Sequence, residues 1–248
     1  MGNFNYYRKG WHLLGFIIPL IYYFDIFKGR LELVYATRAI IFTFLVFFIV
    51  VLIVIDFIRL RNEAFNQLFI KIFSKLLKEE ESARMNATLP YMVANAAIVL
   101  FFPAEIYFLS MGFLLIGDPF AAFFGSKYGK YRFYNGKSLV GIVAFITSSF
   151  LAGLLLLYFF SLTSENLEFS LYKNNVINLN SIFLLLIGSV SAGLTEFFSG
   201  HALGGFLDDN LTIPVISAIV IVISAVYIFG VDSNTVFLDF TKVYNRIN

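Results

Sequence analysis

Residues 117–141, GDPFAAFFGSKYGKYRFYNGKSLVG, form a polar stretch between two strongly apolar segments of the chain. Glycines let backbone N–H groups approach phosphate oxygens, cations neutralise those oxygens, and a carboxylate holds the Mg²⁺ that accompanies a nucleotide. The stretch supplies Asp118, Gly117, Gly125, Gly129, Gly141, Lys127, Lys130, Arg132 and Lys137, together with Ser138. The pattern predicts a nucleotide loop. The alternative is a basic loop that only fixes the orientation of the chain in a membrane.

The composition indicates a polytopic membrane protein. The chain of 248 residues is 59% hydrophobic and 14% charged, with a mean hydropathy of +0.82, whereas soluble domains are about 45–50% apolar. The formal net charge of +2 is too small to indicate a nucleic-acid partner. Because the chain has no cysteine, disulfides, thiolate catalysis and cysteine-based zinc sites are excluded.

Apolar runs along the chain predict an all-α fold, a single integral membrane helical bundle over 1–248. A membrane-spanning helix needs about 20 apolar residues, and the length leaves room for about seven. The predicted spans are 11–27, 37–58, 88–102, 104–124, 138–162, 181–198 and 211–230. Between the second and third spans, apolar residues of 59–87 recur at three and four among lysines and arginines. This spacing predicts an amphipathic helix on the membrane surface.

The distribution of Lys and Arg predicts the orientation. They are concentrated in the amino-terminal segment, in 59–87 and in 125–137, and are fewer in the loops of the opposite side. The positive-inside rule places the amino-terminus and the loops after spans two, four and six in the cytoplasm. A site built from these loops is therefore expected to face the cytoplasm, and the carboxy-terminus to lie outside.

Glu196 lies inside the apolar run that forms the sixth span. A carboxylate there costs about 2.5–3.5 kcal/mol on insertion scales, unless it is paired or faces a wet cavity. Glu196 is therefore a functional candidate, and the alternative is a structural partner for a cation near the interface.

Further polar residues fall on the same predicted face. Asp208, Asp209 and Asn210 precede an apolar helix, where they are helix caps or, opposite the cations of 117–141, part of a Mg-nucleotide site. Glu81 belongs to an acidic patch that favours a solvated surface, and His12 favours an interfacial anchor.

The motifs GDPFAAFFGSKYGK (117–130), GKSLVG (136–141) and EFFSGHALGGFLDDNLTIP (196–214) resemble the CTP-dependent lipid-alcohol kinases. That family groups dolichol kinase, phytol kinase and CTP-dependent diacylglycerol kinase. The likeness extends to RKGWH (8–12), DFIRL (56–60) and LLKEEE (76–81). The chain departs from the family at Ile142, where a small hydroxyl residue is usual, and at Ala87, where glycine is common.

The resemblance implies transfer of the γ-phosphoryl group of CTP to the hydroxyl of a polyprenol, phytol, geranylgeraniol or diacylglycerol in the bilayer. It implies Asp118, Asp208 and Asp209 for Mg²⁺, and Glu196 or Glu81 for the lipid hydroxyl, so that Asp118, Asp209, Glu196 and Glu81 are the catalytic candidates. The implied nucleotide contacts are Gly117, Gly125, Lys127, Gly129, Lys130, Arg132, Lys137, Ser138, Gly141 and Asn210.

Two alternatives stay open from sequence. A cytidylyltransferase that makes a CDP-lipid would use the same nucleotide and metal but would release pyrophosphate. A small-solute transporter would show inverted repeats and ionisable residues at the membrane midplane, whereas the charges of this chain gather at one face. The sequence does not indicate the oligomeric state.

Overall fold

The computed structural model describes residues 10, 13–77, 79–133, 135–163, 167–200 and 203–247, with only the backbone of Glu79 and Glu80. His12 lies outside this range. The α-helices are α2 (Ile17–Tyr23), α3 (Ala36–Arg59), α4 (Glu63–Phe73), α5 (Thr88–Phe101), α6 (Ala104–Gly112), α7 (Asp118–Tyr128), α8 (Leu139–Thr163), α9 (Leu179–Phe198), α10 (Asp209–Tyr227) and α11 (Ser233–Val236). Strands β1 (Tyr172–Lys173) and β2 (Val176–Ile177) form an antiparallel hairpin. Short 3₁₀ turns lie at Leu14–Phe16, Arg30–Glu32, Glu79–Ser82, Leu203–Gly205 and Phe240–Lys242.

The prediction of an all-α polytopic membrane bundle is confirmed. Five helices of the described part are long and apolar enough to span a membrane, namely α3, the continuous Ala104–Tyr128, α8, α9 and α10. Each of the other two predicted spans contains a shorter apolar helix, Leu14–Tyr23 and Thr88–Phe101. At 1.5 Å per residue, the 14 residues of α5 fall short of a hydrocarbon core of about 30 Å. The count of seven full-length spans is therefore not confirmed.

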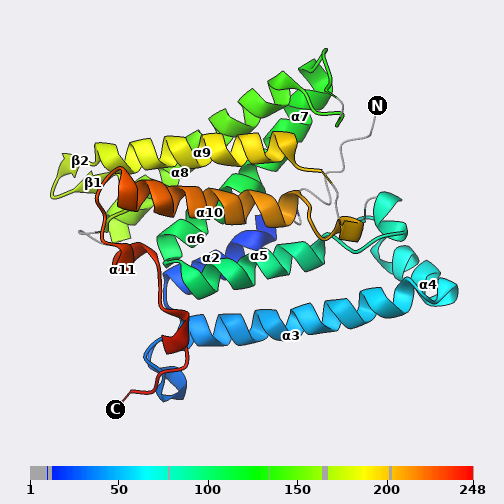
Figure 1. Cartoon of the computed structure of the whole chain (residues 1–248), viewed down its shortest axis with the longest axis horizontal. Helices are drawn as coiled ribbons and strands as arrows, with labels where there is room; N and C mark the ends of the chain where they lie inside the picture. The colour runs from blue at the N-terminus through cyan, green and yellow to red at the C-terminus, as the bar shows by residue number, and fades with distance from the viewer. Residues whose placement is uncertain are drawn as a thin grey trace.

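The helices run beside one another, so that the loops gather at two ends of the bundle (Figure 1). We call one end the α4 end; it holds α4, Glu79–Ser82, the hairpin after α7 and the link from α9 to α10. We call the other the hairpin end; it holds β1, β2, α11 and the carboxy-terminus. The two polar motifs singled out in the sequence thus meet at the α4 end.

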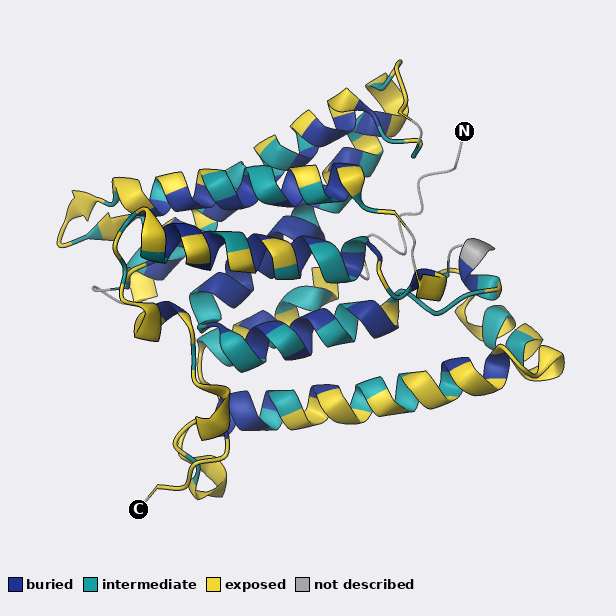
Figure 2. Cartoon of the chain, viewed as in Figure 1, coloured by how far each residue is buried: buried dark blue, intermediate teal, exposed yellow. Residues whose placement is uncertain are grey.

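Burial separates a central helix from a peripheral one. Within the most apolar window, 67% of Ala104–Tyr128 is buried but only 17% of α3, whose outer face stays exposed along most of its length (Figure 2). An apolar helix with such an exposed face suits contact with lipid tails. The helix Ala104–Tyr128 therefore forms the centre of the bundle, and α3 lies at its edge.

The central helix contains a π-helical segment, Phe113–Gly117, directly before Asp118. Pro119 has no N–H, and in a regular α-helix its ring would clash with the carbonyl four residues earlier; the wider π turn relieves this. Residues 118–128 are consequently helical. The helix predicted over 104–124 thus continues by one further turn to Tyr128, and within 117–141 the described residues 129–133 and 135–138 lie outside the helices.

Small residues bring α8 and α9 close together, as at other membrane helix interfaces. A Cβ added to Gly153 of α8 would collide with the side chain of Leu185 of α9, and one added to Gly193 with that of Ile146. The two helices therefore approach at glycines on both sides of the contact.

We expect Gly153→Leu to lower the thermal midpoint of the purified protein in detergent. Overpacking a tight interface costs about 1–3 kcal/mol. The matched control is Gly200→Ala, because a Cβ at Gly200 meets nothing within 4 Å. Equal midpoints for the two variants, measured by a thermal shift assay, would show that α8 and α9 do not pack in this way.

The separation of the two ends also predicts labelling from opposite sides of the membrane. Tyr131 at the α4 end is 85% exposed, and Asn175 lies exposed in the β1–β2 turn. Single cysteines at these positions are each unique, because the chain has none. In sealed cells, a membrane-impermeant thiol reagent should modify only the one at Asn175. Modification of both cysteines would contradict the arrangement.

Candidate active site

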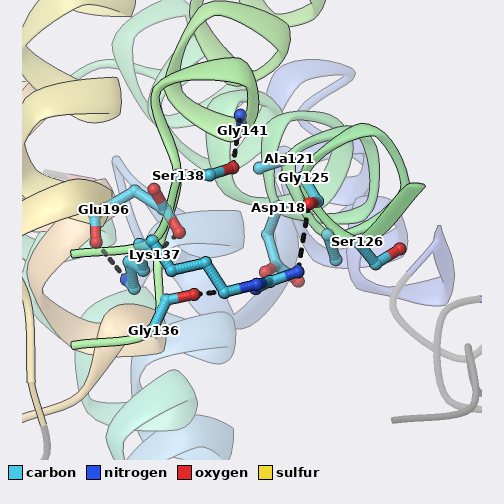
Figure 3. Close-up of a pocket in the computed structure, with 11 residues that line it drawn as sticks. Asp118, Ala121, Gly125, Ser126, Gly136, Lys137, Ser138, Gly141 and Glu196 are labelled. Atoms are coloured by element: carbon cyan, nitrogen blue, oxygen red, sulfur yellow. Dashed lines mark hydrogen bonds and ion pairs between the residues drawn. The ribbon is translucent and has the colours of Figure 1, made fainter. Parts of the chain in front are cut away.

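A pocket at the α4 end is lined by the start of α7, the 129–138 hairpin, the first turn of α8 and the end of α9 (Figure 3). Its lining residues are Asp118, Ala121, Ala122, Gly125, Ser126, Arg132, Gly136, Lys137, Ser138, Gly141 and Glu196. Its volume is about 150 Å³, whereas pockets for whole drug-sized ligands measure about 300–1,000 Å³. The pocket is therefore of a size for a small polar group, such as the phosphates of a larger ligand.

Helix α7 presents its small residues to this pocket. Asp118, Ala121, Ala122 and Gly125 recur at spacings of three and four, which places them on one face of a helix. The small side chains leave the space that the pocket occupies.

Lys137 joins three elements of the site. Its Nζ lies 3.1 Å from Oε1 of Glu196 and 3.4 Å from Oδ2 of Asp209, and it also donates to the backbone carbonyl of Glu196. Ser199 accepts from Lys137 at 3.1 Å and is hydrogen-bonded to Asp209. One ammonium thus connects the hairpin with the end of α9 and the start of α10.

Arg132 holds the hairpin against α7. Its Nη1 donates to the carbonyl of Gly136 at 2.8 Å and its Nη2 to that of Gly125 at 3.2 Å. Arg132 also forms a β-bridge with Ser138 across the hairpin. Arg132 therefore lines the pocket together with Asp118 and the first turn of α8.

The amino-terminal end of α8 contributes the partial positive charge of its backbone N–H groups. Ser138 is buried, and its Oγ accepts the N–H of Gly141 at 3.2 Å. Both residues line the pocket, so the first turn of α8 lies at its wall. A helix amino-terminus attracts anions through its N–H groups and its dipole. With Arg132 and Lys137, it makes this part of the pocket suited to phosphate.

The carboxylates at the pocket fit a nucleotide-bound metal. Among the described residues there is no group of three or more His, Cys, Asp or Glu side chains that could hold a metal ion. Mg²⁺ bound to phosphates, however, takes only one or two carboxylates and keeps several waters. Asp118 and Glu196 line one pocket, and Glu196 and Asp209 share the ammonium of Lys137. The pocket therefore offers the one or two carboxylates that phosphate-bound Mg²⁺ takes from a protein.

Asp208 and Asn210 have a structural place. The carboxylate of Asp208 accepts the N–H groups of Asn210 and Leu211 at 3.0 and 3.3 Å, and its other oxygen accepts the Asn210 side chain at 3.0 Å. Asp208 therefore caps α10. Asp208, Asp209 and Asn210 all lie outside the pocket lining, and Asp209 is connected to it by its ion pair with Lys137.

The remaining cations and Glu81 lie away from the pocket lining. Lys127 lies over the rings of Phe123 and Tyr128, at 5.7 and 5.2 Å, and Lys130 is exposed. Glu81 is buried, and its backbone carbonyl accepts from Arg59 at 2.9 Å.

The glycines of the motif mainly allow close packing. A Cβ at Gly117 would approach the ring of Phe145 to 2.6 Å, and a Cβ at Gly125 would approach the Cα of Gly141 to 3.4 Å. One at Gly129 would collide with the carbonyl of Gly125. Of these glycines, Gly125 and Gly141 line the pocket. That they let phosphate approach the backbone stays a prediction.

Sequence reasoning missed two contacts of the site. Ser199 bridges Lys137 and Asp209, and Asn135 donates to the carbonyl of Phe197 from the hairpin. The position of Ser199, one turn after Glu196 and just past the end of α9, was the available signal.

The fold and the pocket together define a polytopic membrane protein of helices, with a pocket lined by Asp118, Arg132, Lys137 and Glu196 at one end of its bundle. No family model matches the chain, and no solved structure matches it. The chain is 30% identical over 181 residues to CTP-dependent diacylglycerol kinase 1 of Saccharomyces cerevisiae, covering 71% of this chain and 61% of the yeast protein. It is 30% identical over 165 residues to the protein of the same name in Schizosaccharomyces pombe, covering 66% of this chain and 71% of that protein.

A third relative, an uncharacterised protein of Rickettsia prowazekii, is 24% identical over 217 residues and covers 86% of this chain and 90% of its own length. The aligned part thus spans less than two thirds of the S. cerevisiae relative and most of the bacterial one. The chain belongs to the family of the CTP-dependent diacylglycerol kinases.

Proposed function

We propose that this chain is a CTP-dependent lipid kinase that transfers the γ-phosphoryl group of CTP to the hydroxyl of diacylglycerol. The observation that carries the proposal is the pocket at the α4 end, where Asp118 and Glu196 meet Arg132 and Lys137 at the first turn of α8. The names of the fungal relatives support CTP as donor and diacylglycerol as acceptor. Polyprenol and phytol are the other acceptors that the sequence resemblance implies.

In the proposed reaction, the lipid hydroxyl oxygen attacks the γ-phosphorus of CTP. The bond between the γ-phosphorus and the β,γ-bridging oxygen breaks, CDP leaves, and the hydroxyl proton passes to a carboxylate. Phosphoryl transfer needs mainly positioning and charge stabilisation, and the pocket offers both.

The residues divide this work by position. Arg132, Lys137 and the first turn of α8 neutralise the phosphate oxygens, since all three line the pocket. Asp118 would hold Mg²⁺, which would supply positive charge against that of the phosphates. Glu196, on the opposite wall of the pocket beside Lys137, accepts the proton of the lipid hydroxyl.

The location of the pocket favours a lipid acceptor. It lies where the membrane helices α8, α9 and α10 end, which is the level at which the headgroup hydroxyl of diacylglycerol resides. We propose that this end faces the cytoplasm, where CTP is present, in agreement with the positive-inside distribution.

The acceptor is tested with the purified protein, γ-labelled CTP and a panel of diacylglycerol, phytol, geranylgeraniol and dolichol in mixed micelles. We expect labelled phosphatidate from diacylglycerol, resolved by thin-layer chromatography, and much less product from the other alcohols. Preferred labelling of an isoprenoid alcohol would leave the kinase reaction standing and overturn the diacylglycerol assignment.

A further inference from the structure

A buried ion pair lies at the end of α3, outside the lining of the pocket. Asp56 is 5% exposed and Arg59 is 1% exposed, and Nε of Arg59 lies 2.6 Å from Oδ1 of Asp56. Removing two charges from water costs more than their attraction returns, unless further hydrogen bonds satisfy them. The groups that hydrogen-bond to this ion pair therefore show which segment of the chain the pair holds in place.

The partners lie almost entirely in one segment, residues 81–86. Nη1 of Arg59 donates to the carbonyl of Glu81 at 2.9 Å, and Nη2 donates to the carbonyl of Arg84. The second oxygen of Asp56 accepts the N–H of Asn86 at 3.0 Å. The pair thus fixes the backbone of 81–86 at three points, and Asn66 of α4 accepts a further bond from Arg59 at 3.2 Å.

Segment 81–86 in turn holds the link that leads into α10. Met85 donates its N–H to the carbonyl of Gly204 at 3.1 Å. Gly204 and Gly205 have φ of 66° and 97°, values that side chains disfavour. A Cβ on Gly205 would meet the side chain of Arg84 at 3.2 Å, so this link lies closely against the segment.

The link ends at the acidic motif of the site. Asp208 caps α10 three residues after Gly205, and the next residue, Asp209, pairs with Lys137 at the pocket. Hydrogen bonds therefore run from Arg59 through 81–86 to Gly204, and the chain continues from there over four residues to Asp208 at the start of α10.

We propose that Asp56 and Arg59 are positioning residues for the phosphoryl transfer. By fixing segment 81–86, they hold the 203–205 link, and with it the start of α10, so that Asp209 keeps Lys137 directed at the pocket. This inference rests on the proposed kinase function for its catalytic consequence, but its structural part stands independently.

The structural part is tested by hydrogen exchange on the full-length protein in micelles. Arg59→Gln should accelerate amide exchange in 81–86 and in 203–209, since both lose their support. The matched control is Arg38→Gln. Arg38 is likewise buried, at 3% exposure, and likewise binds carbonyls, those of Val99 and Leu100, but near the hairpin end. The Arg38→Gln variant should therefore show the wild-type rate of amide exchange in 203–209.

Turnover is measured on the same preparations. Small misplacements of catalytic groups have large effects on rate, so kcat of Arg59→Gln should fall about tenfold or more. KM for CTP should change less, because the Arg132 hairpin is held by α7. Arg38→Gln should keep a kcat near that of wild type. Arg59→Lys keeps the charge but not the guanidinium fork, so its exchange and kcat should change as in Arg59→Gln. If Arg59→Gln does not fold, the measurements on Arg59→Lys test the proposal.

Wild-type protection of 203–209 in the folded Arg59 variants would overturn the proposal, as would an unchanged kcat beside an active wild type. If the wild-type protein itself transferred no phosphate from CTP, the proposed function would fail. The exchange of 203–209 would still decide whether Arg59 positions the start of α10.

Discussion

Asp118→Asn should lower CTP-dependent phosphoryl transfer to lipid by about 10²-fold or more, if the carboxylate contributes a few kcal/mol to the transition state. Asp118 is the acidic residue that α7 places in the pocket, across from Glu196 and Lys137. Asn has nearly the same shape but lacks the charge that balances a nucleotide-bound Mg²⁺. The measurement is kcat with saturating CTP over a range of Mg²⁺ concentrations.

The control for this variant is Asp25→Asn. Asp25 is exposed in the link from α2 to α3, which is hydrogen-bonded to the carboxy-terminal segment through Val34 and Asn245. Its φ of 48° is a left-handed conformation that Asn tolerates well. It should retain near-normal turnover. A folded Asp118→Asn protein with full activity at limiting Mg²⁺ would end the assignment of Asp118 to the metal.

Lys137→Met should be nearly as severe, and the same loss should follow in every lipid tested. The ammonium of Lys137 is the group that joins Glu196, Asp209 and Ser199 across three elements. Losing a charged donor aimed at developing charge costs about 2.7–4 kcal/mol, which corresponds to about 10²–10³ in kcat. The removal also leaves two carboxylates facing each other without the cation between them.

Lys173→Met is the matched control for Lys137. Lys173 forms a 2.6 Å ion pair with Glu168 at the hairpin end, with side chains that are 36% and 44% exposed. Such surface pairs contribute about 0–1 kcal/mol. Turnover of Lys173→Met should equal that of wild type. If Lys137→Met also retained wild-type turnover, Lys137 would be a structural link between helices and not part of the reaction.

Much of the architecture follows from the sequence because hydrophobic length and periodicity are local properties. The seven apolar runs each contain an apolar helix, and the alternation of their direction brings 117–141 and 196–214 to one end. This alternation also explains why Glu196 and Lys137, which are separated by the two spanning helices α8 and α9, were assigned to one site from the sequence.

The parts that could not be predicted depend on contacts distant in sequence. In the sequence, Gly117 and Gly125 fit a phosphate-binding loop and a close contact between helices equally well. The contact is shown only by the residues that a Cβ there would meet, namely Phe145 for Gly117 and Gly141 for Gly125. Asp208 and Asp209 are neighbours in sequence, yet one caps α10 and the other reaches Lys137. The motifs DFIRL (56–60) and LLKEEE (76–81) are part of the family resemblance, but nothing in them predicts that Arg59 binds the carbonyls of Glu81 and Arg84.

The central claim, that the pocket transfers the γ-phosphoryl group of CTP to a lipid, is tested most directly by supplying CTP labelled either at the γ- or at the α-phosphate. The purified wild-type protein and Asp118→Asn are compared with diacylglycerol as acceptor. A kinase moves label from the γ-position into lipid and leaves the α-label in CDP, and the transfer depends on Asp118. Incorporation of the α-label into lipid would instead indicate a cytidylyltransferase, and incorporation of neither label would contradict the account.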